Sequence, residues 1–172
     1  MSLDNIQLSP IVVQQLFNNS LIELNKVQPK IAKQVKEEVG KSSEFQMLGK
    51  FAKRILLLVH QPNTVYVQDE GLTMLIKMIS ACKLSMDDVA IINQWQHPEI
   101  QYQHITQQLD AKIVLLFGIQ LPSIDLPIAF PNFQIQQYNQ QTWLSAPDID
   151  TLIPNPDLRK ELWNSLRQLF GV

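Results

Sequence analysis

The sequence predicts an α/β protein, with a layer of helices on each face of a mostly parallel sheet of about four strands. Apolar runs at Ile55–Val59, Val89–Ile92 and Lys112–Phe117 are typical of strands that are buried on both faces. Amphipathic helical patterns separate these runs, and the order strand, helix, strand favours right-handed crossovers between parallel strands. The front of the chain is helical in pattern and has no such run. We therefore expect a helical arm over residues 1–49 and a three-layer α/β/α domain over residues 50–172.

The arm is predicted from an apolar stripe. Apolar side chains recur every three or four residues after Pro10, a residue that suits the first turn of a helix. The stripe consists of Val13, Phe17, Leu21 and Leu24. Such a stripe can pack on the domain's own sheet, or it can order in the groove of a partner protein. The sequence leaves both possibilities open.

The first half of the domain contains two predicted strands and two predicted helices. Ile55–Val59 is the first buried strand, Thr64–Val67 is expected as a short extended piece, and Asp69 can cap the helix that follows. The apolar face of this helix is predicted to comprise Leu72, Leu75, Ile76, Ile79 and Cys82. The second strand, Val89–Ile92, leads to a Gln-rich helix from about residue 100 to 109.

Four further segments complete the domain. Lys112–Phe117 is the third buried strand. Phe133–Tyr138, FQIQQY, alternates apolar and polar residues, which is typical of a half-exposed or edge strand, and Thr142–Pro147 is one more short strand. Asn155 and Pro156 open the last helix. Its apolar stripe consists of Leu158, Leu162, Leu166 and Leu169.

Charge is distributed unevenly along the chain. Residues 1–54 hold eight Lys and Arg against five Asp and Glu, whereas residues 55–172 hold six against eleven. The lysines of the first part form either a solvated helix face or a basic docking arm. The acidic main body does not favour direct nucleic-acid binding, which relies on a basic face.

Composition also limits the cellular location. The sequence has no run of about 18 apolar residues that would span a membrane. Its first residues lack the pattern of a signal peptide. Cys82 is the only cysteine, so an internal disulfide is excluded. We therefore expect a cytoplasmic protein without a membrane partner.

The motifs of common cofactor sites are missing from the sequence. The five glycines are too far apart for a dinucleotide-binding fingerprint or a phosphate-binding loop, and no G-x-S-x-G elbow is present. Cys82 lies on an apolar helix face, which favours a core position over a reactive thiol. His97 and His104 are seven residues apart, but Pro98 interrupts the helix and no third ligand lies nearby. We therefore predict no cofactor, no metal and no catalytic constellation.

Polar side chains follow the strands of the predicted sheet, at the edge where α/β proteins collect their ligands. They are His60, Gln61 and Asn63 after the first strand, Asn93 and Gln94 after the second, and Asp148 after the last. We take these six residues as a candidate crevice. His60 is open to three interpretations: a general base, a capping or otherwise satisfied histidine, and a binding contact.

The order of the segments resembles the uracil-DNA glycosylase fold, in which the loops after the first and last strands form the active site. Active members carry an acidic Gly-Gln-Asp-Pro-Tyr type motif in the first loop and a His-Pro-Ser type motif in the last. Here the corresponding loops read Val59–Asn63, VHQPN, and Ser145–Asp148, SAPD. The resemblance therefore implies the glycosylase shape without the water-activating acid and the histidine that base excision needs.

A closer resemblance is to the psi subunit family of bacterial DNA polymerase III, a non-catalytic relative of that fold. The chain offers RILLLVHQP, then CKLSMDDVAII, then LSAPDIDTLIPNPDLRKELWNSL. The most specific matches in the last block are Ala146-Pro147, Leu152, Asn155-Pro156 and Leu162-Trp163. The resemblance covers about residues 50–170. The arm departs from the family pattern, because it has no tryptophan before Trp95.

This resemblance implies a non-enzymatic adaptor, an accessory subunit of the replicative clamp loader. In the family, an N-terminal arm docks on the loader's ATPase subunits and the globular body binds a chi subunit. Clamp-loader ATPase subunits and a chi-like subunit are therefore the expected partners, with the apolar stripe of the arm as a contact. The alternatives are a divergent glycosylase-like enzyme or nucleotide hydrolase that uses the crevice, and a free-standing domain that binds a small metabolite there.

Overall fold

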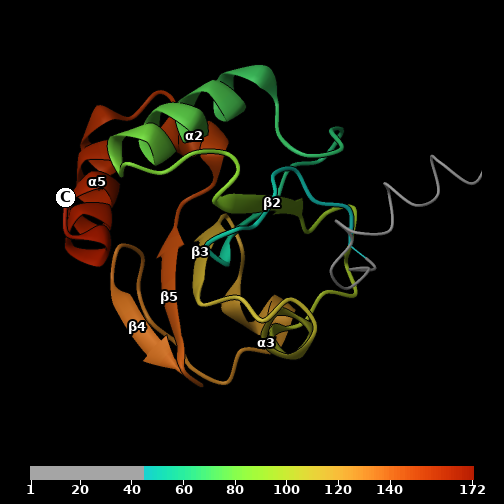
Figure 1. Ribbon diagram of the computed structural model, residues 1–172. Coiled ribbons are helices and arrows are strands. Elements are labelled where there is room, and N and C mark those ends of the chain that lie inside the picture. The colour runs from blue at the N-terminus through green and yellow to red at the C-terminus, as the bar shows by residue number, and fades with distance from the viewer. Residues whose placement is uncertain (1–44) are drawn as a thin grey trace, which may run out of the picture. The chain divides into compact units, whose positions relative to one another are not determined.

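The structure is a computed structural model that describes residues 45–172, and these residues build one five-stranded sheet (Figure 1). The strands are β1 (Ile55–Val59), β2 (Val89–Asn93), β3 (Ile113–Phe117), β4 (Ile135–Tyr138) and β5 (Gln141–Ala146). Their order is β2-β1-β3-β5-β4, with β4 antiparallel to β5 and all other neighbours parallel. The α/β class and the mostly parallel sheet are confirmed. The predicted number of about four strands is one too low, because β4 adds an antiparallel edge.

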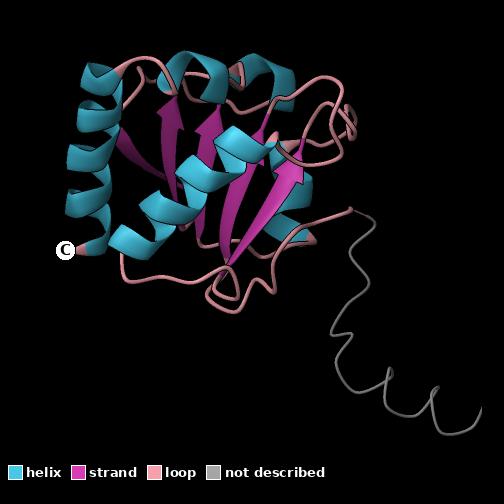
Figure 2. Cartoon of the chain, turned by 90° about the horizontal axis from the view of Figure 1, so that it is seen from above, coloured by secondary structure: helices cyan, strands magenta, loops and turns pink. Residues whose placement is uncertain are grey.

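Helical segments cover both faces of the sheet (Figure 2). They are α2 (Asp69–Ala81), α3 (Tyr102–Gln107), the 3₁₀ helix η1 (Leu121–Ile124), α4 (Ile149–Leu152) and α5 (Pro156–Phe170). The helices α2, α4 and α5 share one cluster of buried apolar residues with the sheet, and α3 and η1 share the other. Between residues 45 and 172, every helix is too short or too polar to cross a membrane.

The continuous apolar run of β1 follows from this cover on both faces. Ile55, Leu57 and Val59 belong to the cluster of α2 and α5. Leu56 and Leu58 belong to the cluster of α3 and η1. All five side chains are at most 3% exposed. Burial of one such side chain contributes about 1.5–3 kcal/mol, so β1 anchors both cores and holds the loop after it in place.

The strands β4 and β5 form a hairpin at one edge of the sheet. Asn139 and Gln140 have left-handed backbone, with φ of 51° and 61°, as a two-residue type I′ turn requires. Trp143 is fully buried, and its Nε1–H donates to the carbonyl oxygen of Tyr138 at 3.4 Å. Gln137 is exposed. The alternating segment FQIQQY therefore contains an edge strand, as predicted.

The opposite edge of the sheet is covered by the segment before β1. Leu48 and Ile91 exchange two backbone hydrogen bonds, with N···O distances of 2.9 and 2.8 Å. Phe45 is 5% exposed and belongs to the same core cluster as α3. Residues 45–49 therefore pack along β2. The rest of the predicted arm, residues 1–44, lies outside the described residues.

Three local predictions are wrong. No strand forms over Thr64–Val67: its first three residues are bends, and the Thr64 carbonyl oxygen accepts a hydrogen bond from the Asn93 side chain. The N-cap of α2 is Gln68, and Asp69 is the first residue of the helix. Ile76 is 40% exposed, because it lies on a flank of α2 that turns away from the sheet.

Candidate functional site

The buried side chain of Asn93, at the end of β2, joins the loops after β1 and β2. Its Oδ1 accepts from the backbone N–H groups of Gln61, at 3.0 Å, and Trp95, at 3.2 Å. Its Nδ2 donates to the carbonyl oxygens of Gln61, at 2.7 Å, and Thr64, at 2.9 Å. Because an amide side chain has two donors and two acceptor positions, Asn93 uses its whole hydrogen-bonding capacity on the backbone.

His60 follows β1 directly and has a side-chain partner. Its Nδ1 lies 2.9 Å from Oε1 of Gln94, and because an amide oxygen only accepts, Nδ1 donates. The imidazole ring also packs edge-on against Trp95, with centroids 5.4 Å apart and planes at 84°. Within residues 45–172, no carboxylate forms a hydrogen bond or ion pair with His60. This pairing favours the interpretation of His60 as a satisfied histidine over that of a general base.

Asp148 and Asn63 serve other purposes. Asp148 follows β5 and caps α4, since Oδ1 accepts from Thr151 N at 2.7 Å and Oδ2 accepts from Thr151 Oγ1 at 2.8 Å. It also lies against Gly118, where an added Cβ would be 2.7 Å from Cβ of Asp148. Asn63 is exposed and has a left-handed backbone, with φ of 70°. Neither side chain hydrogen-bonds to His60.

Of the six crevice residues, the structure therefore brings four together. We call His60, Gln61, Asn93 and Gln94 the carboxyl-edge cluster. Gln61 and Asn93 are 1% exposed and Gln94 is 9% exposed, so their amides are enclosed by protein. Two buried side-chain atoms of the described residues have no hydrogen-bond partner, Oε1 of Gln61 and Oγ1 of Thr64. Sequence reasoning missed the roles of Thr64 and Trp95, whose backbone atoms bind Asn93 and, for Trp95, whose ring packs on His60.

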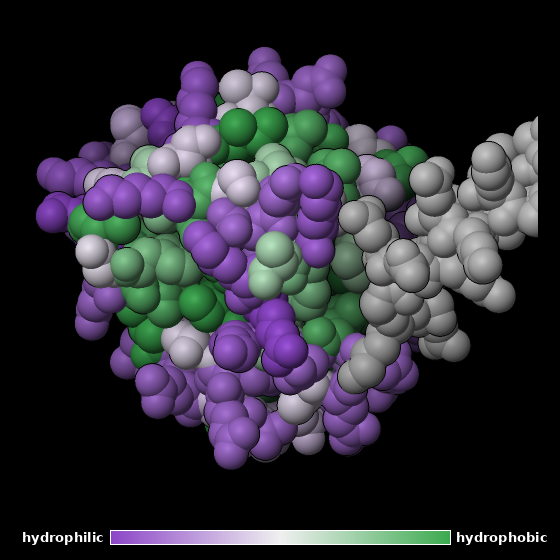
Figure 3. Space-filling view, in the orientation of Figure 1, coloured by the Kyte–Doolittle hydropathy of each residue, from purple (hydrophilic) through white to green (hydrophobic). Residues whose placement is uncertain are grey.

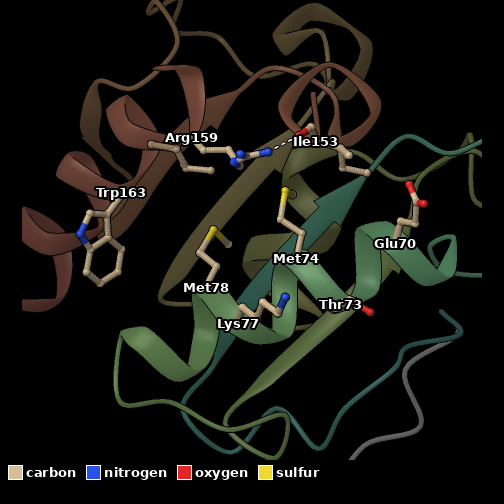
Figure 4. A pocket seen from close by; sticks show the side chains of 9 residues that line it. Glu70, Thr73, Met74, Lys77, Met78, Ile153, Arg159 and Trp163 are labelled. Carbon is tan, nitrogen blue, oxygen red and sulfur yellow. Dashed lines mark hydrogen bonds between the residues drawn. The ribbon is translucent and has the colours of Figure 1, made fainter. Parts of the chain in front are cut away.

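A second region, between α2 and α5, is open and apolar (Figure 4). We call it the α2–α5 groove, and its volume of about 520 Å³ is within the range of ligand sites. Its apolar lining consists of Met74, Met78, Ile153, Leu162 and Trp163, and its polar lining of Glu70, Thr73, Lys77 and Arg159. Apolar surface is visible among hydrophilic side chains around these two helices in Figure 3.

Two cations stand on opposite walls of the groove. Lys77 projects from α2 and Arg159 from α5, with Met74 between them (Figure 4). Nη1 of Arg159 donates to the carbonyl oxygens of Leu152 and Ile153 at the end of α4, and the Leu152 carbonyl also accepts from Asn155 N at 3.3 Å. Within residues 45–172, neither Lys77 nor Arg159 is ion-paired with a carboxylate. The groove therefore joins an apolar floor to a net positive lining, with two cations against the one carboxylate of Glu70.

Among the described residues, three titratable groups have a clearly shifted pKa. Burial raises the pKa of the Cys82 thiol, which keeps it protonated near neutral pH. The backbone N–H of Ser85 lowers the pKa of Asp88, whose Oδ2 it approaches to 2.8 Å. Burial raises the pKa of Tyr138, and the nearby Tyr102 adds to this shift. None of the three groups belongs to the carboxyl-edge cluster or lines the groove.

The two histidines considered as metal ligands bind backbone groups instead. Nε2 of His97 accepts from Gln46 N at 3.2 Å, and Nδ1 of His104 accepts from Gln101 N at 3.1 Å. The Phe45 ring packs on both, with centroid distances of 5.4 and 5.9 Å. In the part of the chain that the structure describes, no three His, Cys, Asp or Glu side chains gather as they would around a metal ion.

Comparisons with known proteins do not assign a family. No model of a known protein family matches the chain, and no curated protein is similar to it. The resemblance to the psi family therefore depends on the residues quoted for it above. The other predicted contact, the stripe of Val13, Phe17, Leu21 and Leu24, lies outside the described residues.

Proposed function

We propose that this chain is a non-enzymatic protein–protein adaptor of psi type, an accessory subunit of the bacterial replicative clamp loader. The observation that carries the proposal is the internal use of polar groups at the carboxyl edge of the sheet. Asn93 binds four backbone groups, His60 pairs with an amide, and Asp148 caps α4. An enzyme would direct an acid and a base of this edge at a substrate. Here the same groups are directed at the protein.

The proposal includes a three-layer fold like that of uracil-DNA glycosylase. It is supported by the four parallel strands β2, β1, β3 and β5 and by helices on both faces. The block that resembles the psi family lies in the last of these strands and the helices after it. Leu152 is fully buried, Leu162 is 3% exposed, and Pro156 is the first residue of α5. These positions are structural, as expected of residues that mark a family rather than a working surface.

The partners follow from the same proposal. Clamp-loader ATPase subunits would contact the N-terminal arm, and a chi-like subunit would contact the globular body. The α2–α5 groove supports a protein partner on the body, because an apolar cavity with polar borders is typical of an interaction site. Direct contact with nucleic acid is not part of the proposal, since residues 55–172 hold six Lys and Arg against eleven Asp and Glu.

A pull-down with the clamp loader of the same cell tests the proposal. The full-length chain should retain the ATPase subunits. Phe17→Asp, which places a charge on the apolar stripe, should abolish retention. Gln15→Asp, which places the same charge two residues away and off the stripe, should not. Absence of the loader from the full-length chain's complexes would refute the adaptor function.

A glycosylase-like enzyme or nucleotide hydrolase is the competing function. One observation favours it: Oε1 of Gln61 is buried without a partner, as a group that awaits a ligand would be. An assay with uracil-containing and deaminated oligonucleotides, and with nucleoside triphosphates, distinguishes the two functions. We expect no turnover. Activity that disappears in His60→Ala would replace the adaptor proposal with the enzymatic one.

A further inference from the structure

We propose that the α2–α5 groove binds an amphipathic helix of another protein, one whose apolar stripe is bordered by acidic residues. The inference deepens the adaptor proposal, on which it rests for the kind of protein that supplies the helix. The chemistry of the contact is argued separately, from the side chains that line the groove.

The walls of the groove can contact an occupant only through their side chains. Both walls are helices, α2 and α5, whose inner backbone groups are hydrogen-bonded within the helix. The carbonyl oxygens of Leu152 and Ile153, at the open end of α4, are taken by Arg159. An added strand would need unpaired backbone donors and acceptors along the groove. A helix needs only an apolar trough for its side chains, and it is therefore the fitting occupant.

The floor of the groove is suited to apolar side chains. Met74 and Met78 are four residues apart on α2, so they lie one above the other on the same face. Thioether side chains are flexible and adapt to partners of different shape. Trp163 lies at one end of the groove (Figure 4) and is half-buried, and tryptophan is one of the residues enriched at the energetic hot spots of protein interfaces. These three side chains form the expected anchor.

The charges of the groove favour an acidic partner. Lys77 and Arg159 face the apolar floor from opposite walls and have no carboxylate partner within residues 45–172. Cations are scarce in this body, with six Lys and Arg among residues 55–172, and two of them are here. Acidic residues beside the apolar stripe of a partner helix would neutralise both, whereas basic residues would be repelled. Glu70, in the first turn of α2, contributes the one opposite charge of the lining.

Methionine-methyl NMR of the full-length chain tests the inference. The chain has five methionines, and Met74 and Met78 line the groove whereas Met47 and Met86 do not. The probes are three helical peptides of about 18 residues, long enough to form a helix in water. They share one stripe of leucines and differ only in the bordering residues, which are Glu, Gln or Lys. We expect the Glu peptide to shift the Met74 and Met78 signals and to bind about fivefold more tightly than the Lys peptide.

Substitutions separate the apolar anchor from the charge preference. Trp163→Ala should weaken binding of all three peptides by about tenfold, and Trp95→Ala, which removes an exposed tryptophan elsewhere, should not weaken it. Lys77→Glu should invert the order of the Glu and Lys peptides. Lys112→Glu makes the same change of net charge at an exposed residue outside the groove and should leave the order unchanged.

Four outcomes would overturn the inference. No shift at Met74 and Met78 with any peptide, or equal affinity for all three, would remove the site or its charge preference. Shifts of the Met74 and Met78 signals that grow with protein concentration in the absence of peptide would identify a second copy of the chain as the occupant. Tighter peptide binding by Leu21→Asp than by the unchanged chain would identify the chain's own stripe as the occupant. Because no loader subunit is present, failure here differs from failure of the pull-down, which concerns the adaptor function itself.

Discussion

The carboxyl edge of the sheet and the α2–α5 groove differ in how their polar groups are used. At the carboxyl edge, amides are abundant and buried, and Asn93 and Gln94 bind partners in the chain. In the groove, polar groups are fewer, but Lys77 and Arg159 face an apolar floor without a carboxylate partner in the described residues. The comparison teaches that the concentration of polar residues is a poor guide to a working surface. Charged or apolar groups that lack a partner within the described residues are the better guide.

The physical reason lies in the cost of unpaired polar groups. A buried amide that loses its partner costs about 1–3 kcal/mol, so loops that close over a sheet supply partners for most of the polar atoms they bury. A histidine and several amides at a strand end can therefore be a structural requirement. The partly exposed apolar side chains of the groove have no such requirement, and burial of their remaining surface against a partner stabilises the complex by about 25 cal/mol per Å². The groove gains from a partner over its apolar surface, whereas at the carboxyl edge only Oε1 of Gln61 and Oγ1 of Thr64 are buried without a partner.

The largest predicted effect concerns the centre of the carboxyl-edge cluster. Asn93→Ala removes four hydrogen bonds to backbone groups of Gln61, Thr64 and Trp95. We expect the free energy of unfolding to fall by about 3 kcal/mol in urea denaturation. The dependence of this free energy on urea concentration should not change. Gln96→Ala, which removes one exposed bond to Thr64, should cost less than about 0.5 kcal/mol. A stable Asn93→Ala protein would mean that these four bonds contribute little to folding, and the contrast between the two regions would collapse.

A second prediction concerns the approach of Asp148 to the end of β3. Gly118 has φ of 68°, and an alanine there would place Cβ 2.7 Å from Cβ of Asp148. Gly118→Ala should therefore reduce the free energy of unfolding by about 2 kcal/mol, from backbone strain and overpacking together. Gly171 has the same φ of 68° with no atom within 4 Å of an added Cβ. Gly171→Ala should show the strain alone, about 1 kcal/mol in denaturation, and equal costs at both glycines would contradict the close packing of this edge.

The sequence predicts the sheet better than it predicts either region. The runs at Ile55–Val59 and Val89–Ile92 identify buried strands, because a strand covered on both faces must be apolar throughout. Strand order also implies that His60 and Asn93 lie near each other, since consecutive parallel strands end at one edge. Their roles could not be predicted. The backbone atoms that Asn93 binds belong to loop conformations that no local pattern encodes.

The groove was not predicted for a different reason. Its lining comes mainly from α2 and α5, which are separated in the sequence by four strands and by about half of the described chain. The spacing of Met74 and Met78 is that of an ordinary helix face, and the same holds for Arg159 and Trp163 on α5. Only the distance between the two helices makes these faces into a groove, and that distance is set by how both pack on the sheet.

The groove side of the comparison is tested by Met74→Ala. Met74 is half-buried and lines the floor, so its truncation should cost about 1 kcal/mol of stability in urea denaturation. Ile76→Ala, on the exposed flank of the same helix, should cost less, because Ile76 is already 40% exposed. The NMR signals of the His60 and Trp95 rings should not change in either variant. A loss of 3 kcal/mol or more at Met74, as estimated for Asn93, would show that the groove is core rather than surface.

The smallest predicted effect concerns Asp88, which belongs neither to the carboxyl-edge cluster nor to the groove. It makes the stability of the folded chain sensitive to acid. Its pKa in the folded chain lies below its ordinary value, chiefly because the backbone N–H of Ser85 donates to the carboxylate. Asp88 therefore adds stability that is fully present above its unfolded pKa and is lost as the pH falls through the lowered folded pKa. Asp88→Asn should unfold more easily than the unchanged chain at neutral pH, and the difference should vanish in acid. Ser85→Ala, which removes only the hydroxyl bond to Asp88, should shift the urea midpoint in the same direction by less. If the stability difference between Asp88→Asn and the unchanged chain persists in acid, the effect comes from packing instead of charge. Any loss of stability in acid would then have to arise in the carboxyl-edge cluster or the groove.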